Sequence, residues 1–374
     1  MANVGAFKNL GQNDIVSTRT LLHEAIPLTG TIVSGTYNDD NIKFHSHGMF
    51  QTVYDYPYLS SSANHIFDLT FGYSANSSLY DTADQQYKKK KNVYNQMSQI
   101  LVGYDHTGSV LEFDADGNIL AGGAKIRESF IIPFSRLLVK DEIKKQTFSM
   151  ELGVHHSYTG SVFSQRVLIT DSGSKENYFV NSPAGEYGIL YATASSGTGT
   201  ANPAFELLKS NGQLPVGLIY YQAGIVVLSA DVFNDNAAGG IIHDSTGSCK
   251  FKNSNGNVTS SITNIINDST IQVITDNFRH RLYNLSFNNT TELNSTIYFC
   301  RANHNEFNYS TNQTYLSQSQ IIVKDENPMN DPVSYITTIG LYSPNNELMG
   351  VAKLSEPLKK TPSQEFTLRV RLDY

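Results

Sequence analysis

Two pairs of histidines are the first residues in this chain whose spacing could support chemistry. His45-Ser46-His47 would place both imidazoles on one face of a β-strand, because side chains two residues apart in a strand point the same way. Such a pair can supply half of a zinc site. No third ligand can be named, and His155-His156 would point its rings to opposite faces. We therefore expect ordinary polar histidines, with no metal and no other cofactor.

Other catalytic and ligand-binding motifs are missing or incomplete. Asp114-Ala115-Asp116-Gly117-Asn118 resembles the start of a calcium loop but lacks the glutamate that closes such loops, so it indicates a hairpin turn. No G-x-S-x-G elbow, P-loop or G-x-G-x-x-G motif occurs. Paired carboxylates for glycoside hydrolysis stay open as an alternative, because their separation is set in three dimensions. We expect a protein that is not an enzyme.

Basic and aromatic side chains are the candidates for partner binding. Arg369 and Arg371 would share one face of the terminal strand, with Lys353 nearby on a preceding strand. Such a basic strip could dock an acidic neighbour, although a solvated sheet face is the ordinary alternative. Three closely spaced tyrosines are large, rigid and amphipathic, which suits an interface and suits a sandwich core nearly as well. They are Tyr54, Tyr56 and Tyr58.

The charge balance argues against a nucleic-acid partner. Lys and Arg sum to 27 and Asp and Glu to 34, so the net charge is −7. Non-specific binding of nucleic acid needs Lys and Arg to displace counterions from phosphates. The one dense basic run, Lys88 to Lys91, is typical of a solvated helix face.

The hydropathy pattern argues against a membrane partner. The longest apolar stretch, Val216 to Ala230, contains Gln222 and is shorter than the roughly 20 residues that span a bilayer. The segment from Met1 to Lys8 lacks the apolar core of a secretion signal. We expect synthesis in a cytoplasm.

The periodicity predicts a mainly β fold. Short runs of alternating apolar and polar residues, separated by polar turns, are typical of antiparallel strands in β-sandwich-like regions. One longer helix is expected around 82–101, with Asp81 or Thr82 as its N-terminal cap and Gly103 as its end.

The C-terminal part gives the clearest geometry. Ser334 to Tyr342 and Glu347 to Leu354 predict a β-hairpin around the turn at 343–346. A final strand follows, in which Phe366, Leu368, Val370, Leu372 and Tyr374 share one face.

Three regions follow from these patterns. We expect an N-terminal β-rich domain with one helix over 1–156, a central sandwich-like domain over 157–327, and a C-terminal hairpin element over 328–374 that packs onto a preceding domain. Within them, Ile271 to Thr275 is predicted as a strand, and Lys140 to Lys145 as a polar helical turn or loop.

Three stretches carry a family resemblance. The first runs from Asn41 to Tyr73 and includes His45-Ser46-His47-Gly48-Met49-Phe50, and the second runs from Asn92 to Lys145. The third runs from Tyr335 to Tyr374 and includes Gly340-Leu341-Tyr342 and Val351-Ala352-Lys353-Leu354. Together they resemble virion structural proteins of contractile-tailed phages, particularly the myoviruses of marine cyanobacteria.

The resemblance implies a non-enzymatic assembly component of the tail, baseplate or neck. It would be found in the virion, assembled in the host bacterial cytoplasm, and its partners would be copies of itself and other virion structural proteins. The family supplies no catalytic residues to carry over. One alternative is a host-surface adhesion module on a fibre or capsid, which would bind a host glycan or receptor. A polysaccharide depolymerase is the less favoured alternative.

Overall fold

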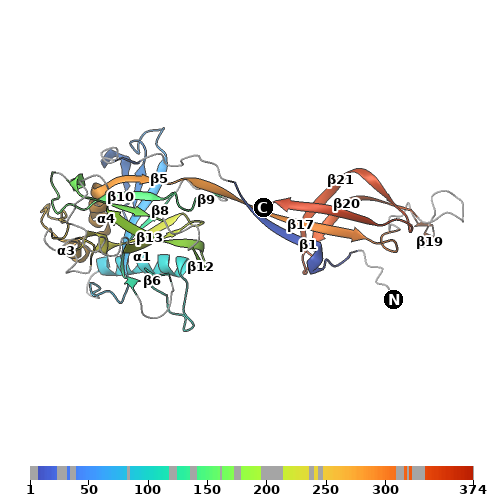
Figure 1. The fold of residues 1–374 in the computed structure, drawn as a ribbon, viewed down its shortest axis with the longest axis horizontal. Coiled ribbons are helices and arrows are strands. Elements are labelled where there is room, and N and C mark those ends of the chain that lie inside the picture. Colours follow the sequence, from blue (N-terminus) through green and yellow to red (C-terminus); the bar gives the residue numbers. More distant parts are fainter. Residues whose placement is uncertain are drawn as a thin grey trace. The chain divides into compact units, whose positions relative to one another are not determined.

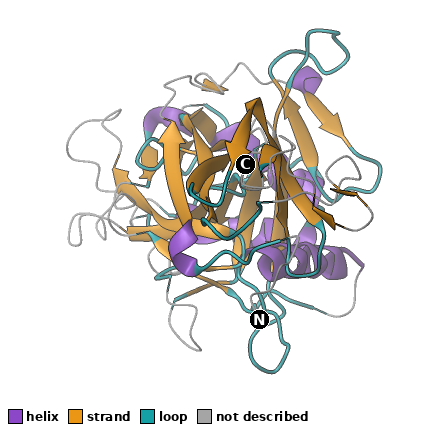
Figure 2. Ribbon diagram, turned by 90° about the vertical axis from the view of Figure 1, so that its right-hand side faces the viewer, coloured by secondary structure: helices purple, strands orange, loops and turns teal. Residues whose placement is uncertain are grey.

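The expected fold class is confirmed. The protein is mainly β, with antiparallel sheets, a long helix and a C-terminal hairpin that is followed by a final strand, and Figure 2 shows how strands dominate it. The computed structural model describes residues 7–22, 32–33, 39–81, 85–117, 124–134, 141–160, 162–171, 178–194, 214–235, 240–242, 247–308, 316–317, 320–321 and 333–373.

The chain divides into two compact units. Unit 1 comprises Met1–Leu21 and Glu292–Tyr374, and unit 2 comprises Leu22–Thr291. These bounds differ from the expected regions 1–156, 157–327 and 328–374. The physical reason is strand pairing over long sequence separations: β8 (Glu128–Pro133) pairs with β15 (Ile225–Ser229), so the first two expected regions share one sheet.

Unit 2 is built on one twelve-stranded sheet. In spatial order its strands are β2 (Ile32–Val33), β16 (Leu282–Ser286), β10 (Ser149–Gly153), β11 (Arg166–Thr170), β13 (Gly185–Ala194), β14 (Leu214–Tyr220), β15, β8, β5 (His65–Tyr73), β4 (Gln51–Tyr54) and β3 (Ile42–Phe44), with β12 (Phe179–Ser182) also paired to β13. A small sheet joins β6 (Phe113–Asp114) to β7 (Lys125–Ile126).

Three α-helices and four short 3-10 helices lie among the described residues. The α-helices are α1 (Gln85–Leu101), α3 (Ile262–Asp268) and α4 (Ile271–Arg281), and the 3-10 helices are η1 (Gln12–Asp14), η2 (Asp39–Asn41), η3 (Val162–Ser164) and η5 (Ala230–Phe233). None of the helices in the described ranges has the length and apolar character needed to cross a bilayer.

Helix α1 packs directly onto β5, and in Figure 1 it lies below β8, β10 and β13. Gly72 permits the close approach, because a Cβ built there would lie 2.7 Å from the backbone nitrogen of Tyr94. The helix confirms the one expected around 82–101, of which residues 82–84 lie outside the described residues.

One lysine of this helix corrects the expected solvated face. Lys88 is exposed, but Lys90 is fully buried and donates a hydrogen bond to the carbonyl oxygen of Ile266. Its ammonium group also lies 6.0 Å from the ring centroid of Tyr73 and 5.5 Å from that of Tyr87. Hydrogen bonding and cation–π contact offset part of the cost of burying this charge.

Two further expectations are wrong. The segment from Ile271 to Thr275 begins α4 instead of forming a strand, because Thr270 caps the helix by accepting a hydrogen bond from the backbone N–H of Val273. The expected loop at 140–145 contains β9 (Asp141–Ile143), which pairs with residues 289–291 at the start of β17 (Asn289–Ala302).

Unit 2 holds a large aromatic core. Phe130 of β8 lies 5.1 Å, between ring centroids, from Phe71 of β5 and 4.6 Å from Phe278 of α4. Phe233 of η5 and Phe251 join the same group. This core clamps the sheet and the helices together, because each buried aromatic side chain removes a large apolar area from water.

Unit 1 contains two sheets and a short hairpin. One sheet has the order β1 (Ile15–Leu22), β17 and β22 (Phe366–Asp373), and β20 (Ser334–Tyr342) pairs with β21 (Leu348–Lys360) as a hairpin. A short pair joins β18 (Leu316–Ser317) to β19 (Gln320–Ile321). The hairpin packs on β22, since a Cβ built on Gly350 would lie 3.4 Å from Leu372 Cδ1.

The alternation expected in the last strand is confirmed from Phe366 to Asp373, whereas Tyr374 lies outside the described residues. Leu368, Val370 and Leu372 are buried or half-buried, whereas Arg369 and Arg371 are exposed. Yet the apolar face has little to pack against. Among the described residues of unit 1, the buried apolar side chains are only Ala302, Leu341 and Val370.

Arg281, at the end of α4, organises loops of unit 2. The side chain is fully buried, and its guanidinium donates to four backbone carbonyl oxygens. The acceptors are Gly153 at 2.9 Å, His155 at 3.0 Å, Ser157 at 3.4 Å and Lys250 at 2.6 Å.

Replacing Arg281 tests this role. Arg281→Leu should lower the free energy of unfolding of unit 2 by about 3 kcal/mol, because it leaves buried carbonyl groups without their donor. Arg127→Leu is the control, since Arg127 is 47% exposed and 3.7 Å from Glu112, and should change stability by less than about 1 kcal/mol. Urea unfolding followed by circular dichroism measures both. Equal effects of the two substitutions would contradict the assignment.

Candidate functional site

A patch of exposed apolar side chains covers the outer face of the β20–β21 hairpin. It consists of Tyr342, Leu348, Met349 and Val351, which are 60%, 54%, 69% and 51% exposed. We call these four residues the hairpin patch. Nine of the seventeen exposed large apolar side chains among the described residues belong to unit 1, so such exposure is concentrated there.

Backbone register explains why the hairpin patch is continuous. Gly340 pairs with Val351 and Tyr342 pairs with Leu348, and residues opposed in antiparallel strands share a face. A Cβ built on Gly340 would lie 2.9 Å from Tyr342 Cε2 and 3.5 Å from Leu348 Cδ1. Glycine at 340 therefore lets both side chains lie flat across the strand.

The Gly340-Leu341-Tyr342 motif thus divides its side chains between two faces. Leu341 is buried and pairs with Gly350 on the side that faces β22, whereas Tyr342 is exposed on the outer side. Likewise Ala352 is half-buried and Val351 exposed. Leu341 therefore packs toward β22, whereas Tyr342 contributes to the hairpin patch.

A second surface lies on the β17–β22 sheet. Arg369 pairs with Phe299, Arg371 with Ile297, and Arg301 with Thr367, so all three arginines share one face. We call Arg301, Arg369 and Arg371 the arginine face. Arginine is enriched in protein interfaces.

Two of these arginines already have acidic partners. Arg301 Nε lies 3.0 Å from Asp14 Oδ1, and Arg371 Nε lies 2.7 Å from Asp373 Oδ1. Arg371 also donates to Ser295 Oγ at 3.0 Å. The side chains of Arg301 and Arg371 are each 55% exposed, so both remain largely accessible to solvent despite their ion pairs.

The structure brings together two of the three expected basic residues. Arg369 and Arg371 share a face as expected, and Arg301 joins them. Lys353 instead lies on the same side of β21 as Val351, away from the side that contacts Leu372. Lys353 therefore borders the hairpin patch and is not part of the arginine face.

The three expected tyrosines lie in unit 2. Tyr54 is half-buried at the end of β4, while Tyr56 and Tyr58 are 57% and 38% exposed in the loop that follows. The ring centroids of Tyr54 and Tyr58 are 6.4 Å apart, and Tyr54 lies 5.7 Å from the ring of His65. The tyrosines form a small aromatic surface that belongs to a different unit from the basic residues.

The histidine pair at 45 and 47 forms a stack. The two rings are nearly parallel, at 3°, with centroids 5.2 Å apart, and burial together with His47 lowers the pKa of His45. His45 Nε2 bonds to Thr52, which donates to Asp68. No group of three His, Cys, Asp or Glu side chains suited to a metal ion occurs within the described ranges. In the sequence that resembles the start of a calcium loop, Asp114 forms an ion pair with Lys125.

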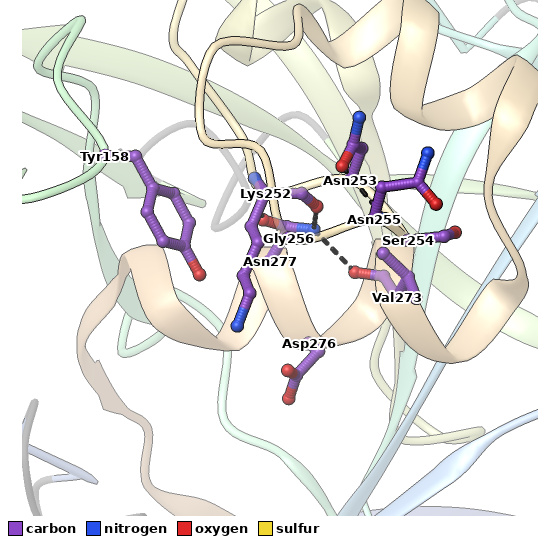
Figure 3. Close-up of a pocket in the computed structure, with 9 residues that line it drawn as sticks. All are labelled: Tyr158, Lys252, Asn253, Ser254, Asn255, Gly256, Val273, Asp276 and Asn277. Carbon is purple, nitrogen blue, oxygen red and sulfur yellow. Dashed lines mark hydrogen bonds between the residues drawn. The ribbon is translucent and has the colours of Figure 1, made fainter.

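A pocket of about 430 Å³ opens on unit 2 beside α4. Figure 3 shows Tyr158 on one side and Asn253 and Asn255 on the other. Asn277 holds the intervening loop, since its side chain donates to the carbonyl oxygens of Lys252 and Val273 at 2.8 and 2.7 Å. The pocket is lined by Tyr158, Lys252, Asn253, Ser254, Asn255, Gly256, Val273, Asp276 and Asn277.

Burial and stacking hold the aromatic wall of this pocket. The ring of Tyr158 stacks on His280, with 4.3 Å between centroids and 24° between planes. His280 bonds to the carbonyl oxygen of Tyr158 at 3.1 Å, and burial raises the pKa of the Tyr158 hydroxyl. An aromatic ring opposite side-chain amides offers both apolar contact and hydrogen bonds to a polar ligand.

Sequence reasoning missed Arg301 and the pocket. Arg301 joins the arginine face only because β17 pairs with β22 in this register. The pocket joins residues from 158 and from 252–277, which no sequence spacing connects.

Comparisons with known proteins give no family assignment. A scan against protein-family models, a search of curated proteins and a search of solved structures each found no match to this chain.

Proposed function

We propose that this chain is a virion structural protein of a contractile-tailed phage. It is a non-enzymatic assembly component of the tail, baseplate or neck that holds neighbouring subunits together. The observation that carries the proposal is the contrast within unit 1, which exposes the hairpin patch and the arginine face while burying few apolar side chains of its own. The resemblance of the sequence to such virion proteins supports the same role.

The two surfaces of unit 1 suit different parts of an assembly contact. Apolar patches of this kind mark protein–protein contacts, because their burial removes apolar area from water. Exposed arginines steer an approaching acidic partner and fix its orientation. Together they would join copies of this chain and other virion structural proteins.

The location is tested directly on particles. Antibodies against the chain, visualised with gold on intact virions by electron microscopy, should label the tail, baseplate or neck. Mass spectrometry of purified particles should detect the same chain. Its absence from mature particles would refute the proposed function.

Charge reversal tests the arginine face. Arg369→Glu combined with Arg371→Glu should lower incorporation into particles about tenfold, because the acidic partner would then meet like charge. The control carries the same change of charge on unit 2, Lys43→Glu with Lys88→Glu, at two exposed lysines. Quantitative immunoblots of purified virions measure incorporation. If both double variants assemble normally, the arginine face does not dock a neighbour.

Host-surface adhesion is the second candidate, and the pocket beside α4 favours it. Amide side chains opposite a tyrosine ring suit a glycan, whose hydroxyl groups need hydrogen bonds and whose ring faces can lie on an aromatic side chain.

Host-cell binding by the purified chain tests this candidate. Tyr158→Ala and Asn255→Ala should each weaken binding about tenfold if a glycan occupies the pocket. Tyr56→Ala is the matched control, since Tyr56 is exposed on another part of unit 2. Absence of binding by the unmodified chain would exclude adhesion through this pocket.

A further inference from the structure

The partner that completes unit 1 can be inferred from the edges, faces and charge of that unit. Strand β1 is the outermost strand of its sheet, and every side chain from Ile15 to Thr20 is exposed. Side chains of a strand alternate between two faces, so neither face of β1 is covered by the residues that the structure describes. A strand that is uncovered on both faces is stable only when another surface covers it.

The edge of β1 also lacks the usual protection against pairing with another strand. Natural sheets guard their edges with charged residues, prolines or bulges. The outer strand β22 carries Arg369, Arg371 and Asp373, and β21 carries Lys353, Pro357 and Lys359. In contrast, the eight residues of β1, Ile-Val-Ser-Thr-Arg-Thr-Leu-Leu, include no proline and a single charge.

The hairpin patch adds a second uncovered surface to the same unit. Burying one Leu or Val side chain stabilises by about 1.5–3 kcal/mol, but unit 1 buries only Ala302, Leu341 and Val370 among its described apolar residues. Unit 1 therefore exposes more large apolar side chains than it buries. This pattern is typical of a domain core that is divided between two chains.

The distribution of charge identifies the partner. Unit 1 holds nine Lys and Arg and ten Asp and Glu, a net charge of −1, so −6 of the total of −7 lies in unit 2. Surfaces with near-zero net charge associate with identical surfaces readily, whereas strongly charged ones repel. An identical copy also presents the exposed carboxylates of Glu347 and Glu356 together with its own arginine face.

We propose that unit 1 is a self-association module, which completes its fold against unit 1 of a second copy of this chain. The β1 edge and the hairpin patch lie inside that interface. The inference deepens the proposed assembly function, on which it rests, by naming the first partner as the chain itself.

The experiment uses the full-length chain in solution. Analytical ultracentrifugation and native mass spectrometry over a dilution series should give a multiple of the 41.4 kDa monomer, which dissociates only at low concentration. Hydrogen exchange should be slow in β1 and β20–β21 of the oligomer and fast after dilution to the monomer. Unit 2 should exchange equally slowly in both states.

Two substitutions and a matched control locate the interface. Val351→Asp in the hairpin patch and Val16→Asp in β1 should each raise the dissociation constant at least about a hundredfold, because each buries a carboxylate in the contact. Val180→Asp introduces the same change at a strand residue of unit 2 that is 70% exposed, and should leave the oligomer intact. Unchanged thermal unfolding of unit 2 in all three variants excludes general misfolding.

The outcomes separate this inference from the proposed function. A chain that is monomeric at all concentrations, with unit 1 protected from exchange, would overturn self-association. So would an oligomer that only Val180→Asp dissociates. If the chain forms an oligomer but is absent from virions, the assembly role is refuted and self-association stands. If the chain is a monomer but is found in virions, self-association is refuted and the assembly role stands. In that case another virion protein would cover the exposed surfaces of unit 1.

Discussion

An apolar sheet face must be covered, and this constraint separates the two units of the protein. In unit 2 the cover comes from the same chain: Gly72 lets α1 lie directly on β5, and Phe130, Phe233 and Phe278 close the space between sheet and helices. In unit 1 the inward face of β22 meets only the β20–β21 hairpin, and the outer faces meet nothing in the described chain. The same rule explains why unit 2 covers its own sheet and why we propose that a partner covers unit 1.

The period-2 alternation of strands gives unit 1 two chemically different outer surfaces. On β22 every second residue points away from the hairpin, which creates the arginine face; on β20–β21 the outward residues are Tyr342, Leu348 and Val351. The inward positions of both sheets are filled mostly by apolar side chains, including the aromatic Phe366 and Tyr298. Charge steers and orients an approaching subunit, whereas apolar burial stabilises the final contact, so in the proposed assembly the two surfaces would have different roles.

Local patterns in the sequence predict what depends on neighbours in the chain. The mainly β class, the helix near 82–101 and the three C-terminal strands follow from periodicity and turn residues, which act over a few positions. Long-range pairing decides the rest. Arg301 lies on the arginine face because of the register between β17 and β22. Residues 141–143 form a strand because they pair with residues 289–291. Lys90 can be buried because the carbonyl oxygen of Ile266 accepts its hydrogen bond.

Long sequence separation also sets when the assembly surfaces can form. Ser17 of β1 bonds to Thr296 of β17, and Lys8 bonds to Glu306, so both contacts close a loop that contains all of unit 2. Loop closure costs conformational entropy, and this cost falls when the intervening chain is already compact. We therefore expect unit 2 to fold before β1 pairs with β17. In that order, only chains with a folded unit 2 would present the surfaces of unit 1, and the proposed assembly would take up correctly folded subunits.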